Sequence, residues 1–136
     1  MSQTLLLDAS AVLAFLQGEP GGEQVQQALQ DQSCAVSAAN QAEIIAKSLD
    51  RGLAPEAIQA ILAELAYAVI EVKAEDGAQA GYLRALTRHL GLSLGDRLCL
   101  TAAKRLNATV LTADRPWTTL AKNLGIDIVC IRPDAH

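Results

Sequence analysis

The chain has 136 residues, 51% of them hydrophobic, and a net charge of −4 at pH 7. This length suits one domain with a sizeable core, so we expect residues 1–136 to form a single domain. The N-terminal residues lack the basic segment of a secretory signal and no run of 18 apolar residues occurs, so we expect a cytoplasmic protein without a membrane span. Three widely spaced cysteines argue against a disulfide framework or a zinc site and read as small core residues.

Short apolar runs alternate with amphipathic segments along the chain. This pattern predicts five strands, at 4–7, 35–36, 67–72, 109–112 and 126–131. Between them it predicts helices through 11–16, at 23–30, ending near 51, from 55, at 75–89, ending at 107 and from about 116. Ser37 is predicted to cap the helix that follows it. Strands separated by helices, joined by right-handed crossovers, predict an α/β/α sandwich of three layers around a parallel five-stranded sheet.

The helix predicted over 75–89 is ended by Gly91 and carries one apolar face. Its members are Ala78, Tyr82, Ala85 and Leu86. We expect this face to pack against the rest of the protein.

Four acidic residues are expected to meet at the carboxyl edge of this sheet, where ligand sites of such folds lie. They are Asp8, Glu43, Asp96 and Asp114. Asp8 and Asp114 follow strands directly, and the other two lie in the first turns of helices that begin at the same edge. Carboxylates repel one another unless a cation lies between them, and oxygen ligands without Cys or His favour Mg²⁺ or Mn²⁺.

Each acid also has a purely structural interpretation. Asp8 and Asp96 could be helix caps or first-turn charges, and Asp114 could be part of a turn. Glu43 could pair with Lys47 one helical turn later. These interpretations stay open for each acid alone, but four coincidences at one edge favour a shared metal site.

Three polar neighbours could support the acids: Ser10, Asn40 and Thr112. Ser10 follows Asp8 by two residues, Thr112 precedes Asp114 by two, and Asn40 precedes Glu43 by three. They are equally well explained as caps or loop residues.

The charge is unevenly distributed along the chain. Residues 1–83 carry three basic and eleven acidic side chains, whereas residues 84–115 carry six basic and two acidic ones. Arg97 and Arg115 each follow a proposed metal ligand and are candidates for contacts to phosphate groups, although surface ion pairs explain them equally well.

Four segments resemble the acidic motifs of PIN-domain nucleases, specifically the VapC-type toxins of bacterial toxin–antitoxin modules. They are LLLDASAVLAFLQGEPG, SAANQAEIIAKSLDRG, LGLSLGDRLCLTAAKRL and ATVLTADRPW, in the family's order. The resemblance implies a PIN-like fold with Asp8, Glu43, Asp96 and Asp114 as metal-binding carboxylates. It also implies a Mg²⁺- or Mn²⁺-dependent endoribonuclease that leaves 5′-phosphate and 3′-hydroxyl ends, inhibited by a cognate VapB-type antitoxin and commonly homodimeric.

Three other functions were weighed. A receiver-like signalling domain also gathers acids around Mg²⁺, but it requires an Asp at the end of the third strand, where this chain has Lys73. A catalytically idle module could keep the fold and bind metal or RNA without turnover. A housekeeping PIN-domain enzyme of RNA processing is the most serious rival, and a neighbouring antitoxin-like reading frame would decide against it.

Overall fold

The computed structural model describes residues 4–133 and contains one parallel sheet. Its strands are β1 (Leu5–Leu7), β2 (Cys34–Ser37), β3 (Ala68–Ile70), β4 (Thr109–Thr112) and β5 (Ile128–Cys130). They are arranged in the order β3-β2-β1-β4-β5, and every neighbouring pair is parallel. This confirms the predicted parallel five-stranded sheet.

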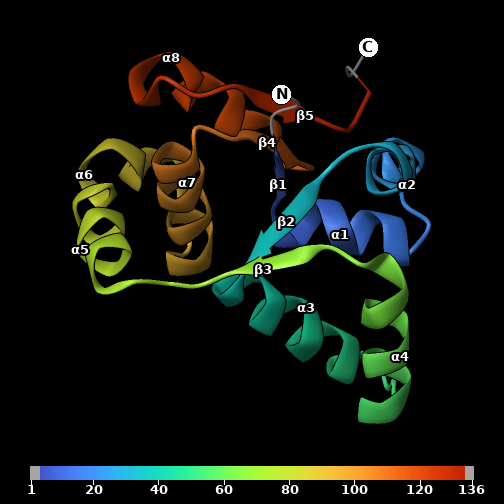
Figure 1. The fold of residues 1–136 in the computed structure, drawn as a ribbon. Coiled ribbons are helices and arrows are strands. Elements are labelled where there is room, and N and C mark those ends of the chain that lie inside the picture. The colour runs from blue at the N-terminus through green and yellow to red at the C-terminus, as the bar shows by residue number, and fades with distance from the viewer. Residues whose placement is uncertain (1–3, 134–136) are drawn as a thin grey trace.

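Helices cover both faces of the sheet (Figure 1). They are α1 (Ala9–Leu16), α2 (Gly22–Asp31), α3 (Ala38–Asp50), α4 (Pro55–Leu65), α5 (Ala74–Tyr82), α6 (Arg84–Thr87), η1 (Arg88–Leu90), α7 (Leu94–Leu106), η2 (Arg115–Leu120) and α8 (Ala121–Leu124). Helices α1 to α4 pack against one face, and α7, η2 and α8 pack against the other. The three-layer α/β/α sandwich is therefore confirmed. No helix within residues 4–133 is both long and apolar enough to cross a membrane.

The central strand β1 contributes side chains to the hydrophobic clusters on both faces of the sheet, because successive side chains of a strand point to opposite faces. Leu5 and Leu7 belong to the core cluster under α1 and α2, whereas Leu6 belongs to the cluster under α7. Cys34 and Cys99 are buried in these two clusters as free thiols, which confirms their prediction as core residues, whereas Cys130 at the end of β5 is only partly buried and belongs to neither cluster.

Strand order reverses next to β1, and this position determines where a site can form. The chain proceeds from β1 to β2 and β3 on one side, then returns to add β4 and β5 on the other. The carboxyl ends of β1 and β4 therefore lie side by side at the switch point, where ligands of such sheets bind.

Ser37 caps α3 as predicted. Its backbone is extended, and its side-chain oxygen accepts a hydrogen bond from the Asn40 N–H at 3.1 Å. The cap fixes the start of the helix that carries both Asn40 and Glu43.

Replacement of Ser37 by Ala should lower the free energy of unfolding by about 1 kcal/mol, because a buried helix N–H loses its acceptor. Urea unfolding of the variant would measure this change as a lower midpoint. The exposed Ser33, replaced in the same way, is the matched control. Equal midpoints for the two variants would contradict the capping role.

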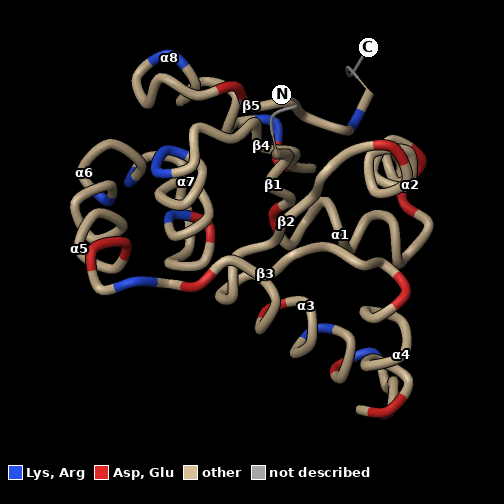
Figure 2. The backbone as a smooth tube through the Cα atoms, in the orientation of Figure 1, with Lys and Arg blue, Asp and Glu red and all other residues tan. Residues whose placement is uncertain are grey.

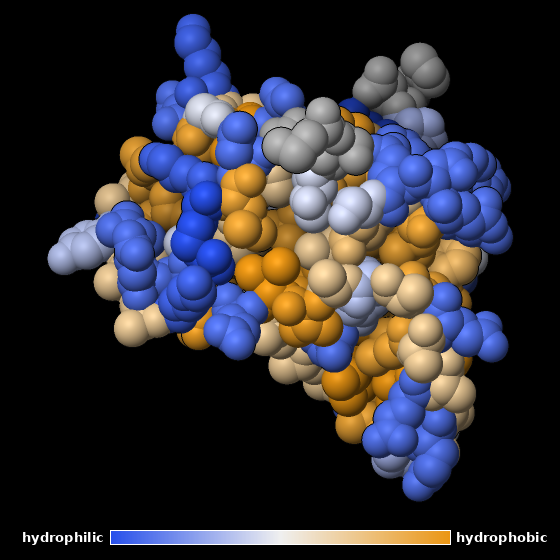
Figure 3. Space-filling view, viewed as in Figure 1, coloured by the Kyte–Doolittle hydropathy of each residue, from blue (hydrophilic) through white to orange (hydrophobic). Residues whose placement is uncertain are grey.

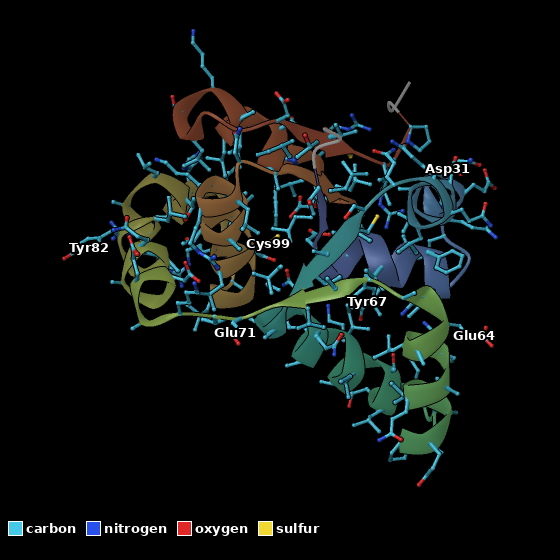
Figure 4. All side chains as sticks on the ribbon, viewed as in Figure 1. Asp31, Glu64, Tyr67, Glu71, Tyr82 and Cys99 are labelled. Atoms are coloured by element: carbon cyan, nitrogen blue, oxygen red, sulfur yellow. The ribbon has the colours of Figure 1, made fainter. Side chains whose placement is uncertain are left out.

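The prediction for residues 75–89 is wrong in two respects. The segment is not one helix but α5, α6 and η1, and the predicted apolar face is exposed. Tyr82 is 77% exposed and points away from the protein (Figure 4). The buried residues are instead Asp76, Ala80 and Thr87, which share the opposite face at helical spacing. The physical reason is an ion pair between Asp76 and Arg105 of α7, 2.9 Å long, which turns that face inward.

The edge strand β3 is largely open to solvent. Val69 of β3 is 45% exposed, and Val72 just beyond it is 42% exposed. Figure 3 accordingly shows apolar residues at the surface in the middle of the face where β3 runs in Figure 1. This edge contrasts with β1, which is buried on both faces and flanked on both sides.

Candidate functional site

Asp8 lies at the switch point and is almost completely buried, with 1% of its surface exposed. Its backbone N–H donates to the Leu111 carbonyl of the neighbouring β4 at 3.1 Å. Its carboxylate accepts hydrogen bonds from the Ala11 N–H at 2.8 Å and the Thr112 hydroxyl at 2.6 Å. Asp8 is thus both the cap of α1, as one interpretation had it, and the centre of a polar cluster.

Ser10 and Thr112 connect Asp8 to the end of β4. The Ser10 hydroxyl lies 2.8 and 2.9 Å from the two carboxylate oxygens and also accepts the Ala113 N–H at 2.9 Å. The Thr112 hydroxyl accepts the Asp114 N–H at 3.0 Å while it donates to Asp8. Each hydroxyl therefore gives its single proton to Asp8 and uses its lone pairs to fix the loop after β4.

The electrostatics of Asp8 are unusual for a carboxylate with so many donors. Burial raises its pKa to about 6, although the hydrogen bonds from Thr112, Ala11 and Ser10 act to lower it. The negative charge of Asp96 raises it further. The fold thus holds an acid whose charge is incompletely compensated by the protein alone.

Asp96 and Asp114 approach the same edge from α7 and from the loop after β4. Asp96 forms a capping box with Ser93: its carboxylate accepts the Ser93 N–H at 2.9 Å, and its own N–H donates to the Ser93 hydroxyl at 3.2 Å. Asp114 is exposed, and its pKa is raised by partial burial and by the charge of Asp96. The indole N–H of the buried Trp117 lies close enough to lower this pKa, but outside hydrogen-bond geometry to any acceptor in residues 4–133.

Glu43 is held from two sides. The Asn40 side-chain amide donates to Glu43 Oε1 at 2.7 Å and to the Gly95 carbonyl at 3.3 Å. Gly95 also lies against the Glu43 carboxylate, which occupies the space that a side chain at position 95 would need. Glu43 is thereby attached to the start of α7, directly beside Asp96.

The charges of three acids converge on the Cys99 thiol, one helical turn after Asp96. Burial raises the pKa of Cys99 well above its ordinary value, and the charges of Asp8, Asp96 and Glu43 add to this rise. In Figure 4 the Cys99 label stands on the side of α7 that faces the sheet. Sequence reasoning treated Cys99 only as a core residue, although its spacing from Asp96 places both on one helix face.

As the side chains stand, no three His, Cys, Asp or Glu residues in the described chain are arranged to hold a metal ion. Asp96 is turned back to its own cap, and Glu43 to Asn40. The donor set nevertheless fits a hard divalent cation, because it consists of carboxylates, hydroxyls and an amide. Asn40 adds a buried carbonyl oxygen, Oδ1, that lacks a hydrogen-bond partner among the described residues. The chemistry of these donors, rather than their present arrangement, is what fits such an ion.

The two candidate RNA contacts already have partners within the protein. Arg97 donates to the Ala80 carbonyl at 3.1 Å, and Arg115 donates to the carbonyls of Arg132 and Pro133 at 2.8 and 2.7 Å. Figure 2 shows basic residues along α6, α7 and α8. Their role in RNA binding stays a prediction.

Residues 5–123 match the sequence model of the PIN domain. The chain belongs to the PIN-domain family. No curated protein matched the chain. The matched range of this PIN domain includes all four acids.

Solved structures share the fold of this PIN domain at low sequence identity. A chain of VapBC-1 from nontypeable Haemophilus influenzae has a TM-score of 0.70 and 18% identity, over 94% of this chain and 98% of that one. A chain of VapBC2 from Rickettsia felis, bound to a DNA fragment from its promoter, has a TM-score of 0.67 and 18% identity, over 93% and 98%. FitAcB from Neisseria gonorrhoeae gives 0.63 and 19%, over 93% and 97%. These likenesses establish the PIN fold over nearly the whole chain.

Proposed function

We propose that this PIN domain is a Mg²⁺- or Mn²⁺-dependent endoribonuclease and the toxin of a VapBC-type toxin–antitoxin pair. The observation that carries the proposal is the environment of Asp8. A carboxylate that is 1% exposed, with a pKa of about 6 and the charge of Asp96 nearby, is poorly stabilised without a cation. The family and the switch-point position support the assignment of that cation to phosphodiester hydrolysis.

Asp8, Glu43, Asp96 and Asp114 would hold the cation. When bound, a divalent ion supplies an activated water and neutralises charge on the phosphate and the leaving oxygen. The surrounding residues orient these ligands: Ser10, Thr112 and the Ala11 N–H fix Asp8 in one rotamer, and Asn40 fixes Glu43. Asp114 is the exposed member of the set, so its side of the cluster is where RNA would approach.

The products would carry 5′-phosphate and 3′-hydroxyl ends, as the family resemblance implies. The proposed partners are RNA as substrate, a cognate VapB-type antitoxin as inhibitor and a second copy of the chain. The likeness to chains of VapBC and FitAB complexes supports the antitoxin.

The test is to incubate purified protein with total RNA and Mg²⁺ and to map new 5′ ends by sequencing. We expect discrete cuts that disappear with EDTA and return with excess Mg²⁺ or Mn²⁺, because the four carboxylates lose and regain their counterion. No cleavage under any metal condition, by protein shown to be folded, would favour an idle binding module instead.

The toxin assignment has its own test. The product of the neighbouring reading frame, added to the cleavage reaction, should suppress the cuts and elute with the PIN domain in gel filtration. Cleavage that continues unchanged in its presence would favour a housekeeping RNA-processing enzyme.

A further inference from the structure

We propose that Gly95 is a positioning residue for Glu43, in that the missing side chain at position 95 determines where the Glu43 carboxylate stands. A Cβ atom at this position would overlap Glu43 Oε1 and lie 2.7 Å from Cδ and 3.0 Å from Oε2. Contacts under 3.0 Å essentially never occur for real Cβ atoms. The Glu43 carboxylate therefore occupies space that only glycine leaves open. The inference rests on the proposed function, because it treats Glu43 as a ligand of the cation.

Asn40 closes the other side of this clamp. Its amide donates both to Glu43 and to the backbone carbonyl of Gly95, so one buried side chain ties the carboxylate to the start of α7. Asn40 is 0% exposed, and its Oδ1 is left without a hydrogen-bond partner within residues 4–133. A buried acceptor without a partner is commonly explained by an ion or a water beside it, so Oδ1 is consistent with a cation position next to the clamp.

Substitution of Gly95 by Ala perturbs Glu43 rather than the fold. Gly95 is the second residue of α7 and does not adopt a positive φ, so alanine fits the backbone. The atoms it would strike belong to the free end of a flexible side chain, which can rotate away. The substituted protein should fold, with its Glu43 carboxylate displaced toward solvent and its contact to Asn40 lost.

The experiment measures Mn²⁺ binding by electron paramagnetic resonance of the free ion, without RNA. Wild type, Gly95→Ala and Gly77→Ala are compared. Gly77 lies in α5, and a Cβ there would meet nothing within 4 Å, so it controls for the addition of a methyl group to a helix. We expect Gly95→Ala to weaken Mn²⁺ binding about tenfold, as for other changes that misplace a metal ligand, and Gly77→Ala to leave it unchanged.

A double-mutant cycle separates positioning from a general structural effect. In a Glu43→Gln background the ligand charge is already gone, so Gly95→Ala should cause no further loss of Mn²⁺ affinity. Nuclear magnetic resonance of the metal-free protein gives a second readout: the Asn40 side-chain amide signals should shift in Gly95→Ala and not in Gly77→Ala.

The outcomes are distinguishable. Wild-type protein that binds no Mn²⁺ would overturn the proposed function itself. Wild type that binds Mn²⁺ while Gly95→Ala binds it equally well would overturn only the role of Gly95. An equal loss of affinity in the wild-type and Glu43→Gln backgrounds would also overturn it, because the effect would then not pass through Glu43.

Discussion

Replacement of Asp8 by Asn will lower RNA cleavage by at least about 100-fold, because even the residues that orient a metal ligand cost 10–100-fold when they are removed. The same substitution will make the metal-free protein more stable at neutral pH. Lower activity together with higher stability is expected when a carboxylate is needed for function but destabilises the folded protein. Cleavage assays and urea unfolding in EDTA measure the two effects on the same preparations.

The pH dependence of this gain follows from the pKa of Asp8, which burial raises from 3.8 to about 6 in the folded protein. A raised pKa means that the folded state favours the neutral acid, so ionised Asp8 destabilises the fold. This destabilisation is absent well below pH 3.8, where the acid is neutral in both states, and complete above about pH 6, where it is ionised in both. The shift corresponds to at most about 3 kcal/mol. We expect a net gain of about 1–2 kcal/mol at about pH 7.5, because Asn satisfies fewer of the three donors.

The control is Asp127→Asn, which changes an exposed carboxylate and should alter neither property. At about pH 4.5 the stability advantage of Asp8→Asn should vanish, since the penalty for ionised Asp8 has then fallen to about 1 kcal/mol and no longer exceeds the hydrogen bonds that Asn fails to form. A variant that is less stable than wild type at both pH values would show that the hydrogen bonds to Asp8 outweigh its burial.

Replacement of Arg105 by Gln will lower the free energy of unfolding by about 2 kcal/mol. Arg105 donates to both carboxylate oxygens of Asp76, at 3.0 and 2.9 Å, and so joins α7 to the first turn of α5. The Asp76 side chain is 3% exposed, so removal of its partner leaves a buried, unpaired charge. The Arg105 side chain is 25% exposed, and solvent screening at that end makes the loss of stability smaller. Urea unfolding at neutral pH measures the loss.

The difference between this variant and wild type should shrink in acid. The hydrogen bond from Arg105 is the main cause of the lowered pKa of Asp76. A carboxylate with a lowered pKa in the folded protein contributes stability at pH values above its unfolded-state pKa. This contribution is lost as the pH falls through the folded-state pKa. Arg84→Gln, an exposed change on α6, is the control. A gap that is constant from neutral to acid pH would contradict the ion-pair explanation.

The sheet and the placement of the acids could be predicted because both follow from strong local patterns. Apolar runs such as 4–7 and 109–112 and the Ser37 cap were read directly from the sequence, and the βαβ order then determined which edge the acids share. The hydrogen bonds of Ser10, Thr112 and Asn40 show how these neighbours hold Asp8 and Glu43. Their spacing from the acids was enough to propose them.

The rest depends on contacts between distant segments. The orientation of α5 is governed by a buried ion pair between positions 76 and 105, which no periodicity in an alanine-rich helix reveals. The sequence offers Arg97 as a candidate for a phosphate contact or a surface ion pair, but it does not reveal the hydrogen bond that the guanidinium donates to the Ala80 carbonyl of α5. Gly95 has no side chain, so its contact with Glu43 cannot be inferred from the sequence. The contact becomes visible only when α3 and α7 are packed together.

The hydrogen bond from the Thr112 hydroxyl to Asp8 affects when the acidic cluster can form during synthesis and folding. It joins two segments that are 104 positions apart, so the buried Asp8 carboxylate lacks this donor, and β1 lacks the second of its two neighbouring strands, until the fourth strand has been synthesised. A nascent chain that has emerged only as far as α6 contains Asp8 and Glu43 but neither Thr112 nor Asp114. Pairing at such sequence separation is also a slow step in folding. The cluster is therefore assembled late, after most of the surrounding scaffold exists.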